Sequence, residues 1–285
     1  MAEFLALDVA VARYVHDGDT VAMEGFTHLI PHAAAHEVIR QRRKDLTLIR
    51  MTPDIIYDQL IGMGCARKLV FSWGGNPGVG SLHRLRDAVE QGWPHRLDLE
   101  EHSHAAMANA YDAGAANLPF AVLRGYKGSD LPAHNTKIRS VTCPYTGERL
   151  ATVPALRPDV AIVHAQRANE AGDVLFEGIV GIQKEVVLAA RRSIVTVEEI
   201  VPDFDDIHAN ACILPRWTVD AVVPVPGGAH PSYAHGYYAR DNSFYAEWDR
   251  ISRDRERFLA WMEEHVMKGS PRDFAGHVTL REQSA

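Results

Sequence analysis

The chain has 285 residues, of which 46% are hydrophobic and 24% are charged. This length and composition are typical of one large globular domain or two small ones, and they exclude a disordered or fibrous protein. The formal net charge of -7 argues against nucleic-acid binding, because neutralising phosphates requires clustered Lys and Arg. The three cysteines Cys65, Cys143 and Cys212 are widely spaced. They indicate neither a disulfide framework nor a zinc site, and they favour the reducing cytoplasm.

The N-terminal segment, residues 1–19, contains acidic residues early and has no long apolar run. It therefore predicts neither a signal peptide nor a membrane span. Its pattern is that of an amphipathic helix that ends near Gly18.

Apolar runs rich in β-branched residues alternate with helical patterns along the first two thirds of the chain. Pro31 and Pro53 stand where the first two intervening helices begin, and residues 248–266 predict a charged C-terminal helix. The predicted strands are residues 20–24, 46–50, 68–72, 96–101, 121–124, 160–164 and 194–197. This order predicts an α/β fold, with a mainly parallel sheet covered by helices.

Residues 125–158 interrupt this rhythm with Gly, Pro, Asn, Ser and Thr, and only residues 138–142 predict a short strand. A long connection inside a compact domain usually has a function. We interpret the segment as an excursion within a single domain, residues 1–285, that helps to cover a site.

Ligands of parallel α/β sheets collect at the carboxyl ends of the strands. At the first such end, Gly25 lets another molecule approach the backbone, and the helix that begins at Pro31 has free N–H groups for an anion or oxyanion. An ordinary turn between strand and helix is the alternative.

The second junction, residues 73–81, is rich in glycine. It is no phosphate-binding P-loop, because Ser81 stands where that motif has lysine, and His83 replaces the third glycine of a dinucleotide fingerprint. The segment predicts a turn rich in N–H donors that either borders a ligand or packs closely.

The third junction carries adjacent carboxylates, Glu100 and Glu101, before Ser103, which is a candidate helix cap. A carboxylate here can act as a general base or orient water, or it can simply stabilise the helix N-terminus. Two histidine pairs could indicate a metal, His32 with His36 and His102 with His104. The first pair lacks the glutamate of zinc proteases, and no third ligand is indicated. We therefore predict no metal site.

Taken together, the ordered segments resemble the A subunit of class I CoA-transferases of the glutaconate CoA-transferase type. The resemblance extends from about Leu5 to Trp261 and is carried by residues 25–27, 73–79, 153–154, 158–166, 197–200 and 227–232. The longest stretches look closest to the branch of this family that acts on 3-oxoadipate: EGFTHLIP, MTPD, RKLVFSWGGNPGVGSLHRLRDAVE and GGAHPSYAHGYY.

The resemblance implies the CoA-transferase (NagB/RpiA-like) fold and transfer of CoA from succinyl-CoA to 3-oxoadipate, in the breakdown of aromatic compounds. In this family a glutamate attacks the donor thioester, and an acyl-glutamyl anhydride and then an enzyme–CoA thioester form. That glutamate belongs to the other subunit, so the resemblance implies half of an enzyme. It further implies a partner, the B subunit, in a hetero-oligomer such as A2B2, with acyl-CoA and a dicarboxylic acid as substrates. CoA is then a co-substrate, and no cofactor is permanently bound.

The resemblance also implies site residues. A carboxylate nucleophile requires stabilisation of the oxyanion that it creates, and the family's A subunit offers backbone N–H groups, here those of Gly25 and Phe26. Glu101 matches a position beside the acyl group, where it would orient the substrate or act as a base. We expect further substrate contacts at Thr27, His28, Gly74, Gly75, Asn76 and Gly78.

Two other functions stay open at this point. One is a CoA-transferase-like hydrolase that uses Glu101 to activate water on a ring-containing acyl-CoA. In such hydrolases a glycine follows that position, whereas here His102 follows. The other is a module that binds CoA esters without turnover.

Overall fold

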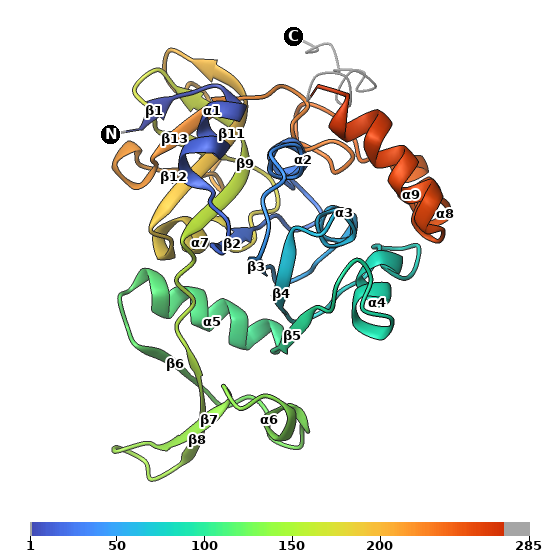
Figure 1. Cartoon of the computed structure of the whole chain (residues 1–285). Coiled ribbons are helices and arrows are strands. Elements are labelled where there is room, and N and C mark those ends of the chain that lie inside the picture. The colour runs from blue at the N-terminus through green and yellow to red at the C-terminus, as the bar shows by residue number, and fades with distance from the viewer. Residues whose placement is uncertain (1, 271–285) are drawn as a thin grey trace.

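The computed structural model describes residues 2–270. Its main feature is a ten-stranded sheet in which all neighbours along the central path are parallel (Figure 1). The order along this path is β1 (Glu3–Phe4), β13 (Ala221–Pro224), β11 (Arg192–Val201), β9 (Val160–Asn169), β2 (Thr20–Met23), β3 (Leu46–Ile49), β4 (Ala66–Phe71) and β5 (Asp98–Glu101). Off this path, β10 (Val174–Phe176) pairs antiparallel with β9 and with β12 (Cys212–Leu214).

Helices cover both faces of this sheet, so its strands are apolar on both sides. In β2, Val21 and Met23 face one core, whereas Ala22 faces the other. The first core lies under α1 (Leu7–Tyr14), α2 (His32–Arg40), α3 (Ile55–Gly62), α4 (His83–Glu90), α8 (Asn242–Ser252) and α9 (Arg255–Met262). The second lies under α5 (His104–Ala115) and α7 (Gln183–Ala189). The predicted α/β fold with a mainly parallel sheet is confirmed.

The seven predicted strands all exist, with shifted ends. The predicted helix 248–266 is wrong, because α8 ends at Ser252 and α9 begins at Arg255. Asp254 caps α9 by accepting a hydrogen bond from the N–H of Arg257 over 2.8 Å. A capping side chain of this kind favours a new helix start over a continuous helix. Short helical turns complete the described chain at Arg216–Thr218 and Glu263–Met267.

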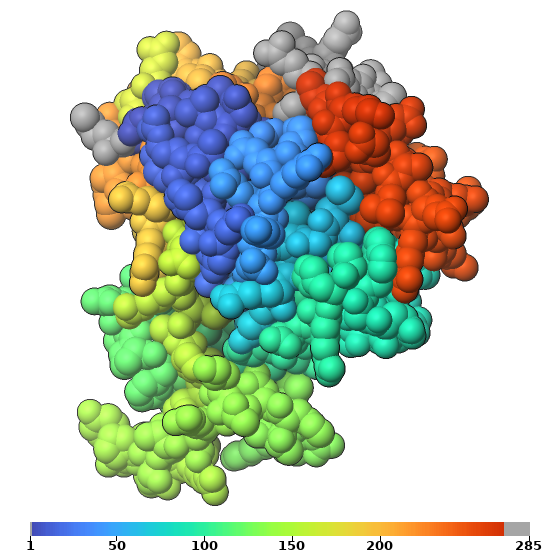
Figure 2. Space-filling model, in the orientation of Figure 1, coloured from blue at the N-terminus to red at the C-terminus, as the bar shows by residue number. Residues whose placement is uncertain are grey.

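A second, antiparallel sheet has the order β6 (Phe120–Leu123), β8 (Arg149–Pro154) and β7 (Arg139–Thr142), and α6 (Leu131–His134) accompanies it. One face packs on α5, where Ala106 and Ala110 meet Ala121 and Val153. The sheet forms a lobe on the far side of α5 from the main sheet (Figures 1 and 2). The predicted strand 138–142 is confirmed as β7, whereas β8 was not predicted.

Candidate functional site

The loop after β2, residues 24–30, turns back sharply on itself, and we call it the Gly25 loop. A Cβ atom on Gly25 would lie 2.7 Å from the carbonyl oxygen of Leu29 and 2.8 Å from that of His28. Thr27 and Leu29 adopt positive φ angles of 57° and 52°. Such backbone conformations are strained for residues with side chains, and they persist where the surroundings impose them. Only glycine therefore fits at position 25.

The buried side chain of Arg50 fixes the orientation of this loop. Its Nη2 donates to the carbonyl oxygen of Gly25 over 2.8 Å, and its Nε donates to that of Thr52 over 2.9 Å. The peptide bond between Gly25 and Phe26 is trans, so the N–H of Phe26 points away from the carbonyl that Arg50 holds. Within residues 2–270, the N–H groups of Gly25 and Phe26 donate to no protein acceptor. Both N–H groups are therefore unpaired within the described chain, and their role as oxyanion donors stays a prediction.

A cavity of about 260 Å³ adjoins the Gly25 loop. Phe26, Thr27 and Ile30 contribute to its wall, so the structure brings two of the predicted site residues to it. The remaining lining residues follow β3, β4 and β5 or belong to the C-terminal part: Arg50, Thr52, Asp54, Trp73, Pro77, His104, Arg240 and Tyr245. The cavity thus lies at the carboxyl ends of parallel strands, where ligands of such sheets bind.

The glycine-rich loop, residues 73–81, is anchored next to this cavity. The N–H of Gly75 donates to the carbonyl of Pro53 over 3.1 Å, and the side chain of Asn76 donates to that of Tyr245 over 2.7 Å. Gly78 has a φ of 78°. Trp73 and Pro77 of this loop line the cavity, whereas Asn76 is buried and joins the loop to α8.

Residues 4–224 match the family model described as coenzyme A transferase. The chain belongs to the coenzyme A transferase family. It is 66% identical over 268 residues to the A subunit of 3-oxoadipate CoA-transferase from Pseudomonas knackmussii, and the match covers 93% of this chain and 94% of that protein.

The crystal structure of glutaconate coenzyme A-transferase from Acidaminococcus fermentans superposes on this fold with a TM-score of 0.85 and 33% identity, covering 94% of this chain and 90% of that one. A cholesterol ring-cleaving hydrolase IpdA subunit from Rhodococcus jostii is 28% identical over 297 residues, covering 96% of this chain and 95% of that protein. The resemblance to the A subunit of class I CoA-transferases is confirmed, and CoA is the co-substrate of this family.

His28 supports the Gly25 loop of this CoA-transferase subunit from behind. The ring is buried, its Nδ1 donates to the carbonyl of Ile179 over 3.1 Å, and its Nε2 accepts from the N–H of His235 over 2.9 Å. Burial lowers the pKa of His28 to about 4, so the ring is neutral near pH 7. Both ring nitrogens are engaged, so His28 holds the loop and does not face the cavity.

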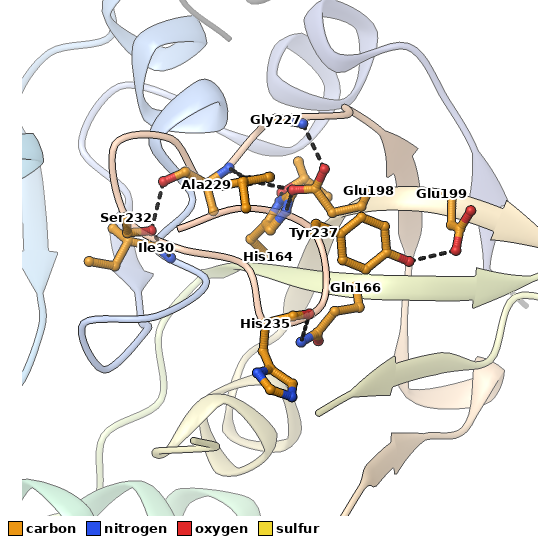
Figure 3. A network of polar contacts seen from close by, with 12 residues as sticks. Ile30, His164, Gln166, Glu198, Glu199, Gly227, Ala229, Ser232, His235 and Tyr237 are labelled. Carbon is orange, nitrogen blue, oxygen red and sulfur yellow. Dashed lines mark hydrogen bonds and ion pairs between the residues drawn. The ribbon is translucent and has the colours of Figure 1, made fainter. Parts of the chain in front are cut away.

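The segment 227–238 buttresses the same loop. The hydroxyl of Ser232 accepts from the N–H of Ile30 over 3.1 Å and donates to the carbonyl of Ala229 over 2.6 Å (Figure 3). The N–H of Leu29 donates to the carbonyl of Tyr233 over 3.0 Å. Two consecutive residues of the Gly25 loop are therefore tied to a segment about 200 positions later in the chain.

A buried polar network holds this segment in turn (Figure 3). The carboxylate of Glu198 accepts from the N–H of Gly227 over 2.7 Å and from the hydroxyl of Tyr238, and it lies 2.7 Å from Nε2 of His164. The Nδ1 of His164 lies 2.7 Å from the hydroxyl of Thr196. Because every partner is buried, the network is rigid and specifies one loop conformation.

Glu101 lies at a different place. Its side chain is exposed and lines another pocket, of about 380 Å³, together with Asn135 and Lys137. Its neighbour Glu100 accepts from His102 over 2.9 Å and from Lys68, and these contacts hold the pKa of Glu100 down at about 2. Within this chain, the structure does not bring Glu101 together with the Gly25 loop, and its role stays a prediction.

Three residues that were not among the predicted site residues shape the site. His104 lines the cavity, and its Nδ1 lies 2.9 Å from the hydroxyl of Ser72, which itself donates to the carbonyl of Met51. Arg50 and Arg240 are the other two. The polar residues just beyond each strand were the available signal for His104 and Arg50, whereas no local pattern pointed to Arg240. Ser103 caps α5 as predicted.

Glu24, the first residue of the Gly25 loop, carries a buried carboxyl. Its Oε1 accepts from the N–H of Met51 over 3.0 Å and from the hydroxyl of Tyr111 over 3.1 Å. Burial raises the pKa of Glu24 to about 7, and the charge of Arg50 opposes this rise. Near neutral pH this carboxyl is therefore partly protonated.

Within residues 2–270, no group of three or more His, Cys, Asp or Glu side chains is arranged to hold a metal ion. His36 of the candidate histidine pair lies with its Nε2 2.7 Å from the side-chain oxygen of Gln59. Among the helices of the described chain, none combines the length and apolarity of a membrane span.

Proposed function

We propose that this chain is the A subunit of a two-subunit enzyme that moves CoA from succinyl-CoA to 3-oxoadipate in the breakdown of aromatic compounds. The observation that carries the proposal is the 66% identity, over 93% of the chain, to the A subunit of a 3-oxoadipate CoA-transferase. A closed A2B2 assembly follows the usual two-fold symmetry of such oligomers. The unpaired thiols of Cys65, Cys143 and Cys212 agree with a cytoplasmic location.

In this proposal, the nucleophile that attacks the carbonyl carbon of the donor thioester is a glutamate of the B subunit, and the N–H groups of Gly25 and Phe26 stabilise the oxyanion. Support comes from the free N–H groups and from Arg50, which fixes their peptide. Such preorganised donors act on the charge that develops in the transition state, and losing one raises the barrier by about 3 kcal/mol.

The remaining predicted residues take supporting parts. Thr27 contacts the acyl group from the cavity wall, and His28 keeps Thr27 in place. Gly74, Gly75, Asn76 and Gly78 hold Trp73 and Pro77 against the substrate. Glu101 orients the substrate once the B subunit completes the site.

The test is expression of this chain with and without its partner. We expect the isolated chain to be inactive, and the complex to convert succinyl-CoA and 3-oxoadipate to succinate and 3-oxoadipyl-CoA. With an acyl-CoA and no acceptor, the complex should trap CoA covalently on the partner's glutamate, detected as a mass increase. Full transfer by the isolated chain would refute the division of labour, and rapid release of free CoA without an adduct would identify a hydrolase. Substrate binding without any turnover would identify the non-catalytic module.

A further inference from the structure

Arg240 lines the cavity beside the Gly25 loop and forms no ion pair with another residue of the described chain. The other cation of the cavity, Arg50, is neutralised by Asp54, whose Oδ2 lies 3.4 Å from its Nη2, with both side chains buried. The carboxyl of Glu24 belongs to the same buried group, behind the loop. Arg240 therefore adds a second positive charge to the cavity, and the nearest carboxylate that interacts with this charge, that of Asp54, is already paired with Arg50.

The guanidinium of Arg240 is held firmly by neutral groups. Its Nη2 donates to the carbonyl of Pro77 over 2.8 Å, and its Cζ lies 3.9 Å from the centre of the Tyr245 ring. Stacking on an aromatic face and one hydrogen bond leave other N–H groups of the planar fork available. A guanidinium fixed in this way is suited to bind a carboxylate, with two parallel hydrogen bonds.

The rest of the cavity wall suits a short hydrocarbon chain. Phe26, Ile30 and Trp73 supply apolar surface, and the N–H of Phe26 is the polar group at the reacting end. Small-molecule sites usually combine mostly apolar walls with a few polar groups that fix the orientation of the ligand. The polar side chains of this wall include Thr27, Thr52 and His104. Among the polar groups of the site, the N–H pair suits a carbonyl oxygen, and Arg240 is a cation for a negative charge on the same ligand.

We propose that Arg240 binds the distal carboxylate of a dicarboxylic acyl group, and that it thereby makes the site selective for dicarboxylic over monocarboxylic acids. This inference rests on the proposed function for the position of the reacting carbonyl at Gly25 and Phe26. Arg240 is then a specificity-determining residue, because it binds a part of the substrate that does not react.

The test compares succinyl-CoA with butyryl-CoA, which has the same four-carbon chain without the distal carboxylate, in the complex of both subunits. Arg240→Met keeps the length of the side chain and removes its charge. We expect the ratio of kcat/KM for succinyl-CoA to kcat/KM for butyryl-CoA to fall on the order of 100-fold. Arg240→Lys should restore part of this ratio. Arg250→Met, an exposed position on the neighbouring α8, is the matched control and should leave the ratio unchanged.

Calorimetric binding of succinate and butyrate to the same complexes separates this inference from the proposed function. Succinate affinity should fall on the order of 100-fold in Arg240→Met, and butyrate affinity should not change. If Arg240→Met lowers kcat/KM equally for succinyl-CoA and butyryl-CoA and leaves the affinity for succinate unchanged, the role of Arg240 is overturned. A wild-type complex that binds succinate through Arg240 but transfers no CoA to 3-oxoadipate refutes the proposed function and supports the inference.

Discussion

The guanidinium of Arg50 donates a 2.8 Å hydrogen bond to the carbonyl oxygen of Gly25, across a sequence separation of 25 residues. A charged side chain that is only 1% exposed thus holds the peptide unit whose other end carries the N–H of Phe26. Burying a guanidinium is unfavourable unless its hydrogen bonds are made, and those made here all fix the shape of the site.

Arg50→Lys tests this contact because it keeps the charge opposite Asp54 and removes the planar fork. We expect kcat of the two-subunit enzyme to fall by about 10- to 100-fold, since the Phe26 N–H loses its fixed direction. Steady-state kinetics with succinyl-CoA measure the effect. Arg13→Lys, at an exposed ion pair with Glu3, is the control, and an unchanged kcat in Arg50→Lys would contradict the assignment.

Gly25→Ala introduces a Cβ atom that would lie within 2.8 Å of two carbonyl oxygens, those of Leu29 and His28. The loop must shift, so we expect kcat to fall on the order of 100-fold or more. Gly125→Ala is the matched control, because its Cβ would meet only the flexible side chain of Leu123, at 3.1 Å. Similar kinetics for the two variants would show that the Gly25 loop does not carry the reaction.

The neutral state of His28 predicts a pH dependence of stability. Burial lowers its pKa from 6.5 to about 4, so below pH 6.5 the unfolded chain takes up a proton that the folded chain refuses until about pH 4. The free energy of unfolding should therefore decrease as the pH falls through this window, by about 3 kcal/mol from this one group. Urea unfolding at pH 7 and pH 4.5 measures the decrease. His28→Gln should show a smaller decrease, and an identical one would refute the contribution of His28.

Two adjacent tyrosines test the buried network. The hydroxyl of Tyr238 donates to Glu198 and accepts from the N–H of Ala229, so Tyr238→Phe leaves a buried N–H without a partner. We expect it to lower the free energy of unfolding by about 2–3 kcal/mol. Tyr237→Phe removes a hydroxyl that bonds to Glu199 at a half-buried position. This variant should lower the free energy of unfolding by no more than about 1 kcal/mol. Equal losses in urea denaturation would exclude a special role for the network.

The sequence predicted those parts of the fold that local patterns encode. Strands such as β2 and β3 are short apolar runs bounded by turn signals, and Ser103 caps α5 because a serine hydroxyl can accept from a nearby backbone N–H. Short strands such as β1 and β12 depend on pairing with distant strands and carry too few residues for a periodic signal.

The site was predicted only where glycine marks it. Gly25 and the residues after it are visible because a glycine at the end of a buried strand indicates a sharp turn or a close approach to the backbone. No local pattern shows that Arg50 is buried and that Arg240 is partly buried. A charged residue leaves the solvent only where a particular set of partners receives it. Those partners come together only in the folded chain. They are Gly25 and Asp54 for Arg50, and Pro77 and Tyr245 for Arg240.

The anchoring of the glycine-rich loop to Tyr245, 169 residues later, has a consequence for how the molecule is made. The ribosome synthesises Phe26 and its neighbours in the cavity wall long before it synthesises the C-terminal residues that complete the cavity. Contacts between such distant segments form late, since closing a long loop costs entropy before any contact repays it. Nascent chains that end before Arg240 would therefore present the Gly25 loop without the complete cavity.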